Sequence, residues 1–409
     1  MKQYNFKMTI NIQTKYSTIK NFHLIKDKLN KIKEMNPPSF ETFNIDIDEI
    51  INKCSNLNKY KNVIIIGNGG SVNSTRAFYN AIDSKRNFCF VMTMEPDFLN
   101  YVLKKYPKEN SIVIAISKSG STIGVLESLM FFINNNYDIS VITSFSGPLY
   151  EIAKKKKYHL IEHPNIGGRY GAKTSCSFIP AYLMGYDLNK LNNGFKIGHE
   201  RYSFNKNIDE NDALKLATVL YNLELKDIVD VFMPIYSSKL SGFLPIIVQL
   251  MHESFGKEKK GMSFFGDLAP ESQHHTNQRF FGGKNNICGV FVNVLNQDDS
   301  TSKVIIPNEL GDIKLGDEFL KNLSNIPYHK SLEYEFLGTY NDAIEKKIPI
   351  CLVSVNKIND ETIGEFMAFW QYFAVYSAIL REVNPYDQPQ VENSKKISIK
   401  MRNQYTKSL

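Results

Sequence analysis

The 409-residue chain has few cysteines and no long hydrophobic run, and both absences exclude whole classes of protein. Its five cysteines lie far apart and form no Cys-x-x-Cys pair, so they fit neither a disulfide framework nor a zinc cluster. No apolar stretch approaches the roughly 20 residues that a membrane-spanning helix needs. The first residues also lack the apolar core of a signal peptide. We therefore expect a cytoplasmic protein that does not bind membranes.

Positive charge is in only slight excess. The 49 Lys and Arg residues face 42 Asp and Glu residues, for a formal net charge of +7. Spread over this length, such an excess suits an anionic small molecule but does not indicate a nucleic-acid-binding protein. Hydrophobic residues make up 43% and charged residues 22%, which excludes wholesale disorder. At roughly 100–200 residues per domain, the length allows two or three domains.

Short apolar runs alternate with helix-like stretches from about Asp46 onward, a pattern typical of parallel sheets flanked by helices. Strands are expected at 63–67, 88–92, 111–116, 139–143, 228–234, 287–294 and 348–354. Helices are expected at 19–32, 125–133, 149–153, 213–225 and 241–254.

The alternation is interrupted once, at a polar segment over 185–210 that we interpret as a linker. An amphipathic helix at 361–382 is expected near the end, before a basic tail at 395–407. The predicted organisation is an N-terminal extension, two α/β domains, and a C-terminal helix with its arm. Their predicted bounds are 1–45, 46–190, 205–357 and 358–409.

A glycine-rich turn, Gly67-Asn68-Gly69-Gly70-Ser71, follows one predicted strand and precedes a helix. Glycines let the backbone approach a ligand closely, and a helix start offers unpaired N–H groups to an anion. A dinucleotide-binding fingerprint would need Gly or Ala where Val72 stands, and no acidic residue ends the next strand, so this interpretation is disfavoured. A tight turn without a ligand remains the alternative.

A second loop, Ser117-Lys118-Ser119-Gly120-Ser121-Thr122, follows another apolar strand and opens a helix. One hydroxyl is enough to cap a helix, whereas this loop has four beside a glycine. Both the helix dipole and the free amides favour a dianion there. The loop therefore predicts a phosphate site, with an over-decorated helix cap as the alternative.

Two further motifs place an arginine after a glycine turn and a glutamate on a helix. The first is Gly167-Gly168-Arg169-Tyr170, and the second runs from Gln249 through Glu253 to Lys257. A guanidinium can stabilise negative charge that develops next to a carbonyl, although a surface arginine is the plainer interpretation of the first motif taken alone. Gln249 and Glu253 share a helix face, and the apolar run that precedes them predicts a buried cleft beside Glu253.

The last motifs are Ser272-Gln273-His274-His275 and the long segment that runs from Asn384-Pro385-Tyr386 through Gln388 to Lys395. Imidazole titrates near neutral pH and can shuttle a proton. A metal site at the histidine pair is the alternative, but neighbouring helix residues diverge and no i,i+4 ligand completes a set. Pro389 suits the first turn of a helix, which would leave Lys395 about two turns beyond Gln388.

Taken together and in this order, the motifs from Gly67 to Lys395 resemble the phosphoglucose isomerase family. The resemblance implies two sugar-isomerase (SIS) αβα sandwich domains with mainly parallel five-stranded sheets, plus a C-terminal helical arm. Residues 1–45 match no part of it. Gly171 stands where the family usually has Ser, which calls a local hydrogen bond into question.

The resemblance implies the interconversion of glucose 6-phosphate and fructose 6-phosphate through a cis-enediol(ate), a step of glycolysis and gluconeogenesis. Glu253 would move the proton between the two carbons, His274 with Lys395 would open the sugar ring, and Arg169 would stabilise the enediolate. Substrate and phosphate contacts would come from Gly70, Ser71, Ser117, Ser119, Thr122, Gln249 and Gln388, and from Lys118 mainly through its backbone amide. No metal or redox cofactor is expected.

The same resemblance implies a homodimer with shared active sites, in which His274 comes from the neighbouring subunit. Sugar phosphates would be the only ligands, without nucleic acid. Two other functions stay open. A dual phosphoglucose/phosphomannose isomerase would use the same chemistry, and a non-catalytic sugar-phosphate-binding regulator would need the phosphate loop without Glu253, His274 and Lys395 together.

Overall fold

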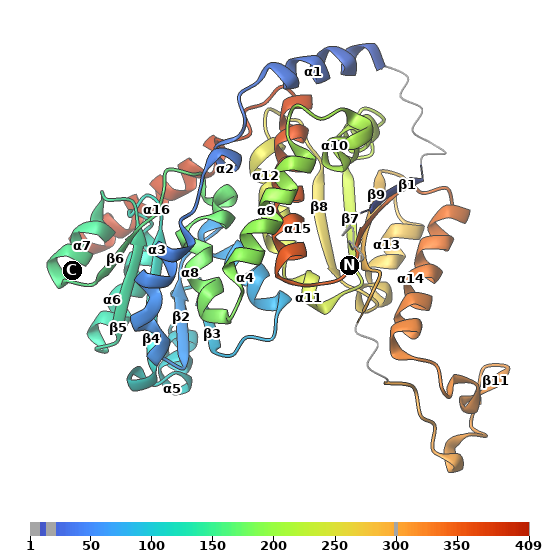
Figure 1. Cartoon of the computed structure of the whole chain (residues 1–409), viewed down its shortest axis with the longest axis horizontal. Coiled ribbons are helices and arrows are strands. Elements are labelled where there is room, and N and C mark those ends of the chain that lie inside the picture. The colour runs from blue at the N-terminus through green and yellow to red at the C-terminus, as the bar shows by residue number, and fades with distance from the viewer. Residues whose placement is uncertain (1–8, 14–21, 298–301, 409) are drawn as a thin grey trace.

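The computed structural model describes residues 9–13, 22–297 and 302–408, which form an α/β protein built around two five-stranded sheets (Figure 1). The first sheet has the strand order β3-β2-β4-β5-β6, and all its strands are parallel. Its strands are β2 (Asn62–Ile66), β3 (Asn87–Val91), β4 (Ser111–Ser117), β5 (Asp138–Thr143) and β6 (His159–Glu162). All five residues of β2 and all seven of β4 are buried, as strands covered on both faces must be.

The second sheet has the order β1-β12-β9-β7-β8, in which four strands are parallel and β1 is antiparallel to β12. Its strands are β1 (Thr9–Gln13), β7 (Asp230–Ile235), β8 (Ser263–Leu268), β9 (Ile287–Val294) and β12 (Ile350–Val355). The predicted sheet class is therefore confirmed. The start of the chain, for which the sequence offered no role, supplies an edge strand that pairs with residues more than 300 positions away.

Helices surround both sheets (Figure 1). In the first half they are α1 (Phe22–Glu34), α2 (Ser39–Thr42), α3 (Ile47–Cys54), α4 (Gly70–Ala81), α5 (Pro96–Lys105), α6 (Ile123–Asn134), α7 (Pro148–Lys156) and α8 (Ser175–Met184). In the second half they are α9 (Leu188–Tyr202), α10 (Asp212–Glu224), α11 (Ser238–Ser241), α12 (Leu244–Phe255), α13 (Thr276–Gly282), α14 (Tyr328–Glu345), α15 (Asp360–Leu380) and α16 (Glu392–Ser408). Short 3₁₀ helices include η3 (Gly168–Lys173), η5 (Glu271–His274) and η8 (Pro389–Val391).

The predicted linker over 185–210 is wrong, because most of it forms α9. Asp187 caps the helix by accepting from the backbone N–H groups of the second and third residues after it. The helix packs against α15 through two glycines: a Cβ at Gly194 would lie 1.8 Å from the backbone oxygen of Glu361, and one at Gly198 would lie 2.5 Å from Ala368 Cβ. The two glycines thus bring α9 close to α15, beside a buried apolar face formed by Leu188, Leu191, Phe195 and Tyr202.

The helix predicted at 361–382 is confirmed in place but is not amphipathic, since 18 of the 21 residues of α15 are buried. It lies between the two sheets and joins them into one hydrophobic core, which runs from Val63 of β2 to Val353 of β12. Two of its buried polar side chains find partners inside this core: Glu365 pairs with Arg201, and the Tyr376 hydroxyl donates to the backbone of Tyr202 at 2.5 Å.

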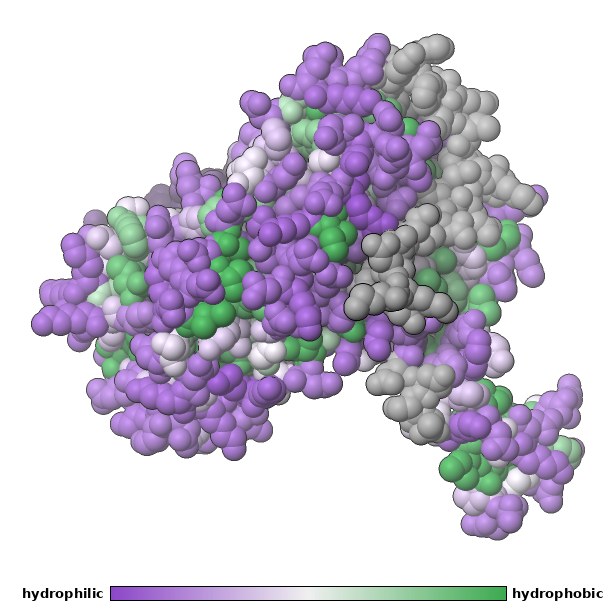
Figure 2. All heavy atoms as spheres, in the orientation of Figure 1, coloured by the Kyte–Doolittle hydropathy of each residue, from purple (hydrophilic) through white to green (hydrophobic). Residues whose placement is uncertain are grey.

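An excursion over residues 302–327 protrudes from the second half and carries a small hairpin of β10 (Lys314–Leu315) and β11 (Glu318–Phe319) (Figure 1). It holds exposed apolar side chains, among them Ile305, which is 81% exposed. Figure 2 shows hydrophobic residues as green spheres on this protruding part. Within the ranges described, no helix is long and apolar enough to cross a membrane.

Candidate active site

The predicted phosphate residues gather at one edge of the first sheet, where neighbouring strands β2 and β4 end. Ser117 and Thr122 hydroxyls lie 3.0 Å apart, and Ser121 donates to Ser119 at 3.1 Å. Thr122 occupies the N-cap of α6 but makes no capping bond, so the hydroxyls are not used up by the helix start. Ser117 and Ser71 are buried, and burial lowers the pKa of the half-buried Lys118. The arrangement offers convergent donors at a helix N-terminus, which suits an anion.

The glycine turn before α4 connects this edge to the other predicted residues. Gly69 has a φ of +58°, and a Cβ there would lie 2.9 Å from the Gln249 amide nitrogen. A Cβ at Gly70 would lie 2.2 Å from the backbone nitrogen of Arg169. The two glycines therefore let the start of α4 lie directly against the Arg169 turn and α12.

The Arg169 guanidinium is buried and joins three separate parts of the chain. Nε donates to Ser254 Oγ at 2.9 Å, and Nη1 donates to Glu253 Oε2 at 3.0 Å and Gln388 Oε1 at 2.9 Å. Nη2 donates to the backbone oxygens of Pro385 and Asp387 at 2.6 and 3.1 Å. The plainer interpretation of Arg169 as a surface residue is thus wrong, and the 3₁₀ turn η3, the end of α12 and the C-terminal segment meet at this side chain.

Glu253 lies in the last turn of α12 with its carboxylate between two donors. Oε2 accepts from Arg169, and Oε1 accepts from Gln249 Nε2 at 3.0 Å. Gln249 in turn accepts from Asn73 Nδ2 at 2.8 Å, so α4 and α12 are tied together behind the carboxylate. The Glu253 side chain keeps 28% of its surface exposed, which leaves one side open to a ligand. A fixed, accessible carboxylate beside a guanidinium is suited to abstract a proton whose departure leaves negative charge.

Several residues of the site were not predicted individually. Lys257 is almost fully buried and donates to the backbone and side chain of Asp387 at 2.6 and 2.5 Å, which lowers the pKa of Asp387. Tyr170 and Ser254 share a hydrogen bond of 2.8 Å. These four residues, Lys257, Asp387, Tyr170 and Ser254, lie inside the sequence motifs. The motifs therefore indicated that they belong to the site. Asn73 carried no such signal, because only the fold brings α4 to α12.

Gly171 opens the turn after Arg169 to a cysteine. A Cβ at this glycine would lie 3.3 Å from Cys176 Sγ and 3.5 Å from Thr174 Oγ1. Thr174 Oγ1 donates to the Gly171 backbone oxygen at 2.7 Å, and Cys176 Sγ does so at 3.2 Å. These two side chains occupy the space that a larger residue would need, and the Arg169 contacts do not depend on it.

His274 is exposed in η5, and the structure does not bring it to Glu253. Its neighbour Gln273 donates to Tyr236 Oη at 2.8 Å, beside the carboxyl ends of β7 and β8. Glu253 lies at the other edge, since the adjacent His252 accepts from the N–H of Phe264 at the start of β8. A strand of this length advances about 16 Å. Within one chain, Glu253 therefore lies towards the amino ends of the strands of the second sheet, and His274 lies towards their carboxyl ends.

Lys395 is also exposed, in the first turn of α16, where its Nζ donates to Glu392 Oε1 at 2.7 Å. The turn η8 begins with Pro389 and lies between Gln388 and Lys395, as predicted. Further along α16, Arg402 binds both carboxylate oxygens of Glu127 on α6, at 2.6 and 2.9 Å. The C-terminal arm is therefore fastened to the first half of the molecule near the helix that follows the phosphate loop.

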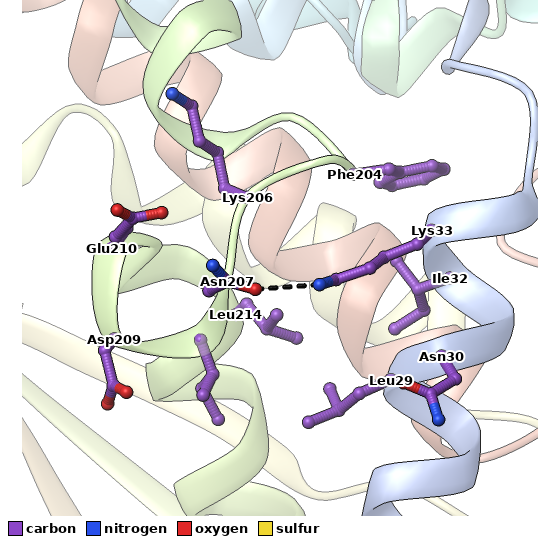
Figure 3. Close-up of a pocket in the computed structure, with 11 residues that line it drawn as sticks. Leu29, Asn30, Ile32, Lys33, Phe204, Lys206, Asn207, Asp209, Glu210 and Leu214 are labelled. Carbon is purple, nitrogen blue, oxygen red and sulfur yellow. Dashed lines mark hydrogen bonds between the residues drawn. The ribbon is translucent and has the colours of Figure 1, made fainter.

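Neither the pair His274-His275 nor the pocket beside α1 has the features of a second functional site. Across the described residues no cluster of three or more His, Cys, Asp or Glu side chains could hold a metal ion, the pair His274-His275 included. A pocket of about 420 Å³ lies between α1 and the segment 204–214 (Figure 3), where Lys33 donates to Asn207 at 2.7 Å. None of the predicted site residues lines it.

The comparison with protein families gives one match over almost the whole chain. The model of the family described as phosphoglucose isomerase matches residues 40–409. Among curated relatives, the glucose-6-phosphate isomerase of Methanocaldococcus jannaschii is 29% identical over 364 residues, which cover 86% of this chain and 86% of that protein. The glucose-6-phosphate isomerase of Campylobacter jejuni is 25% identical over 407 residues, with 95% and 93% covered.

Solved structures share the fold. A hypothetical protein from Thermus thermophilus superimposes with a TM-score of 0.84 at 23% identity, over 97% of this chain and 99% of that one. A glucose-6-phosphate isomerase from Chlamydia trachomatis gives a TM-score of 0.71 at 18% identity, over 94% and 74%.

Proposed function

This chain belongs to the phosphoglucose isomerase family, and we propose that it interconverts glucose 6-phosphate and fructose 6-phosphate with Glu253 as the base. The observation that supports this most directly is the Glu253 carboxylate, held by Arg169 and Gln249 yet partly open. Arg169 lies where it can stabilise the enediolate that forms when the proton leaves. Electrons move only within the substrate in this reaction, so no redox cofactor is required.

The phosphate would bind at the hydroxyl loop, at some distance from the reacting carbons. Donors there would come from the hydroxyls of Ser117, Ser119 and Thr122, which among the described residues bond only within the loop, from the amide of Lys118, and from the start of α4 at Gly70-Ser71. The side-chain amide of Asn68 lies beside the start of α6, because a Cβ at Gly124 would lie 3.3 Å from one of its terminal atoms. Gln388, from the C-terminal segment, accepts from Arg169 at 2.9 Å.

The activity is tested by coupling the consumption of fructose 6-phosphate to glucose-6-phosphate dehydrogenase. We expect turnover with fructose 6-phosphate without added metal, and no loss after treatment with EDTA. The same assay with mannose 6-phosphate measures discrimination at C2. Absence of turnover in pure, folded protein would refute the proposal and leave sugar-phosphate binding as the function.

We further propose a homodimer in which His274 of the partner subunit completes each site and, with Lys395, opens the sugar ring. The placement of Glu253 and His274 towards opposite edges of one sheet supports this, since both must reach one sugar. The protruding excursion over 302–327, with exposed side chains such as Ile305 and Ile313, supports a contact with a second copy. The five buried thiols suit a reducing cytoplasm.

Shared sites predict recovery of activity when two inactive variants are mixed. Glu253→Gln and His274→Ala chains are each expected to be nearly inactive. After joint unfolding and refolding, about half of the chains should pair with the other variant, and each mixed dimer regains one intact site. Activity should therefore rise to about a quarter of the wild-type value, measured per chain with the coupled assay. A mixture that stays as inactive as its components would argue against shared sites.

A further inference from the structure

The segment that links α1 to α3 carries α2 (Figure 1), which contacts η3, the 3₁₀ turn that contains Arg169. At one end, α1 is fixed to the second half: Lys28 Nζ donates to the Leu380 backbone oxygen at 2.7 Å and to Tyr221 Oη at 3.2 Å. At the other end, α3 packs against α8 of the first half. Between them, α2 brings Phe40 into the core, where its side chain is 1% exposed.

Phe40 lies in an aromatic cluster that includes Tyr170, the residue after Arg169. Its ring stacks on that of Tyr170 with centroids 5.3 Å apart and an interplanar angle of 8°, and it meets Tyr372 edge-on at 5.2 Å. The hydroxyl of Tyr372 donates to Glu41, which fixes α2 from the other side. The Tyr170 ring also meets Tyr386 at 5.6 Å, in the C-terminal segment.

Tyr170 and Arg169 share two hydrogen-bond partners. The Ser254 hydroxyl lies 2.8 Å from Tyr170 Oη and 2.9 Å from Arg169 Nε. The Pro385 backbone oxygen accepts from Tyr170 Oη at 3.2 Å and from Arg169 Nη2 at 2.6 Å. The guanidinium itself lies 5.3 Å from the centroid of the Tyr170 ring. A shift of this ring would therefore displace partners on which Arg169 depends.

We propose that Phe40 is a positioning residue for Arg169: its ring holds Tyr170 where Tyr170 and Arg169 share Ser254 and Pro385. Phe40 touches neither the substrate site nor Glu253 in any contact of the described residues, and it acts through the Tyr170 ring. The inference rests on the proposed isomerase activity and extends it to a segment to which the sequence assigned no role. Displacing Arg169 in this way should lower kcat and leave KM nearly unchanged, because the phosphate is proposed to bind at the hydroxyl loop.

The test compares Phe40→Leu with Phe132→Leu. Phe132 is equally buried and lies in the last turn of α6, at the opposite edge of the first sheet from the hydroxyl loop. Both variants lose a stacked or edge-on ring, so both should melt at a lower temperature. We expect Phe40→Leu to lower kcat roughly tenfold to a hundredfold with KM within about twofold. Phe132→Leu should keep kcat and KM. Equal kcat for the two variants would overturn the proposal.

Tyr170→Phe is the second variant, because it keeps the ring and removes only the shared hydrogen bonds. It should lower kcat in the same way, again with little change in KM, and it decides the matter if Phe40→Leu fails to fold. Wild-type kcat in Tyr170→Phe would overturn the proposal. Inactive wild-type protein would instead refute the isomerase function, so the two failures are distinguishable.

Discussion

Replacing Glu253 by Gln is expected to lower kcat by roughly 10²–10⁴-fold, the contribution of a positioned acid–base group. The amide has the shape of the carboxylate and its oxygen can still accept from Arg169 Nη1, which contacts Glu253 at 3.0 Å. The fold should therefore survive, and the loss should be chemical. KM should change little, since the substrate phosphate binds elsewhere.

The matched control is Glu258→Gln, on the exposed turn after α12, where the carboxylate pairs with Lys260 at 3.5 Å. This variant should retain wild-type kinetics. Exchange of the C2 hydrogen with deuterated solvent, followed by NMR, should stop in Glu253→Gln and continue in the control. Near-wild-type turnover or exchange in Glu253→Gln would mean that another group is the base.

Arg169→Lys is expected to produce the second large loss, of roughly 10²–10³-fold in kcat. A lysine keeps the charge but cannot reproduce the planar fork that binds Ser254, Glu253, Gln388 and two backbone oxygens at once. Each acceptor left unsatisfied in the buried part of the site also costs about 1–3 kcal/mol of stability. The melting temperature should therefore fall together with kcat.

Arg86→Lys separates the two effects. Arg86 also binds several acceptors, among them the backbone oxygens of Leu183 and Tyr60 at 2.6 and 3.1 Å, but it lies before β3, at the edge of the first sheet away from the hydroxyl loop. Its replacement should lower the melting temperature and leave kcat unchanged. If Arg169→Lys and Arg86→Lys lose stability and activity in the same proportion, Arg169 has no role in the reaction beyond holding the fold.

The strands could be predicted because their signal is local. Residues 63–66 and 112–116 are continuous apolar runs, and such runs indicate strands buried on both faces. The clustering of Arg169, Glu253, Gln249 and Gln388 was also within reach, since each lies in a motif. Their exact partners were not, because Asn73 and Ser254 depend on how α4 and α12 pack.

The two errors in the fold have different physical causes. Segment 188–202 looks polar because Lys and Asn residues separate its apolar ones, although Leu188, Leu191, Phe195 and Tyr202 recur at helical spacing and form a buried face. Helix α15 looks amphipathic because polar groups such as Glu365 were assigned to solvent, whereas Arg201 and Tyr202 satisfy that carboxylate inside the protein. Hydrophobic pattern alone cannot distinguish a solvated polar residue from one with a buried partner.

The pairing of β1 with β12 sets an order in which the molecule can be completed during synthesis. The first sheet is contiguous in the chain, from Asn62 to Glu162, and can form while the rest is still being translated. The second sheet cannot close until Ile350–Val355 has emerged to receive residues 9–13. Strand β1 is therefore synthesised early but can pair only after β12 has been synthesised. The catalytic site is complete only after the last few dozen residues have been added.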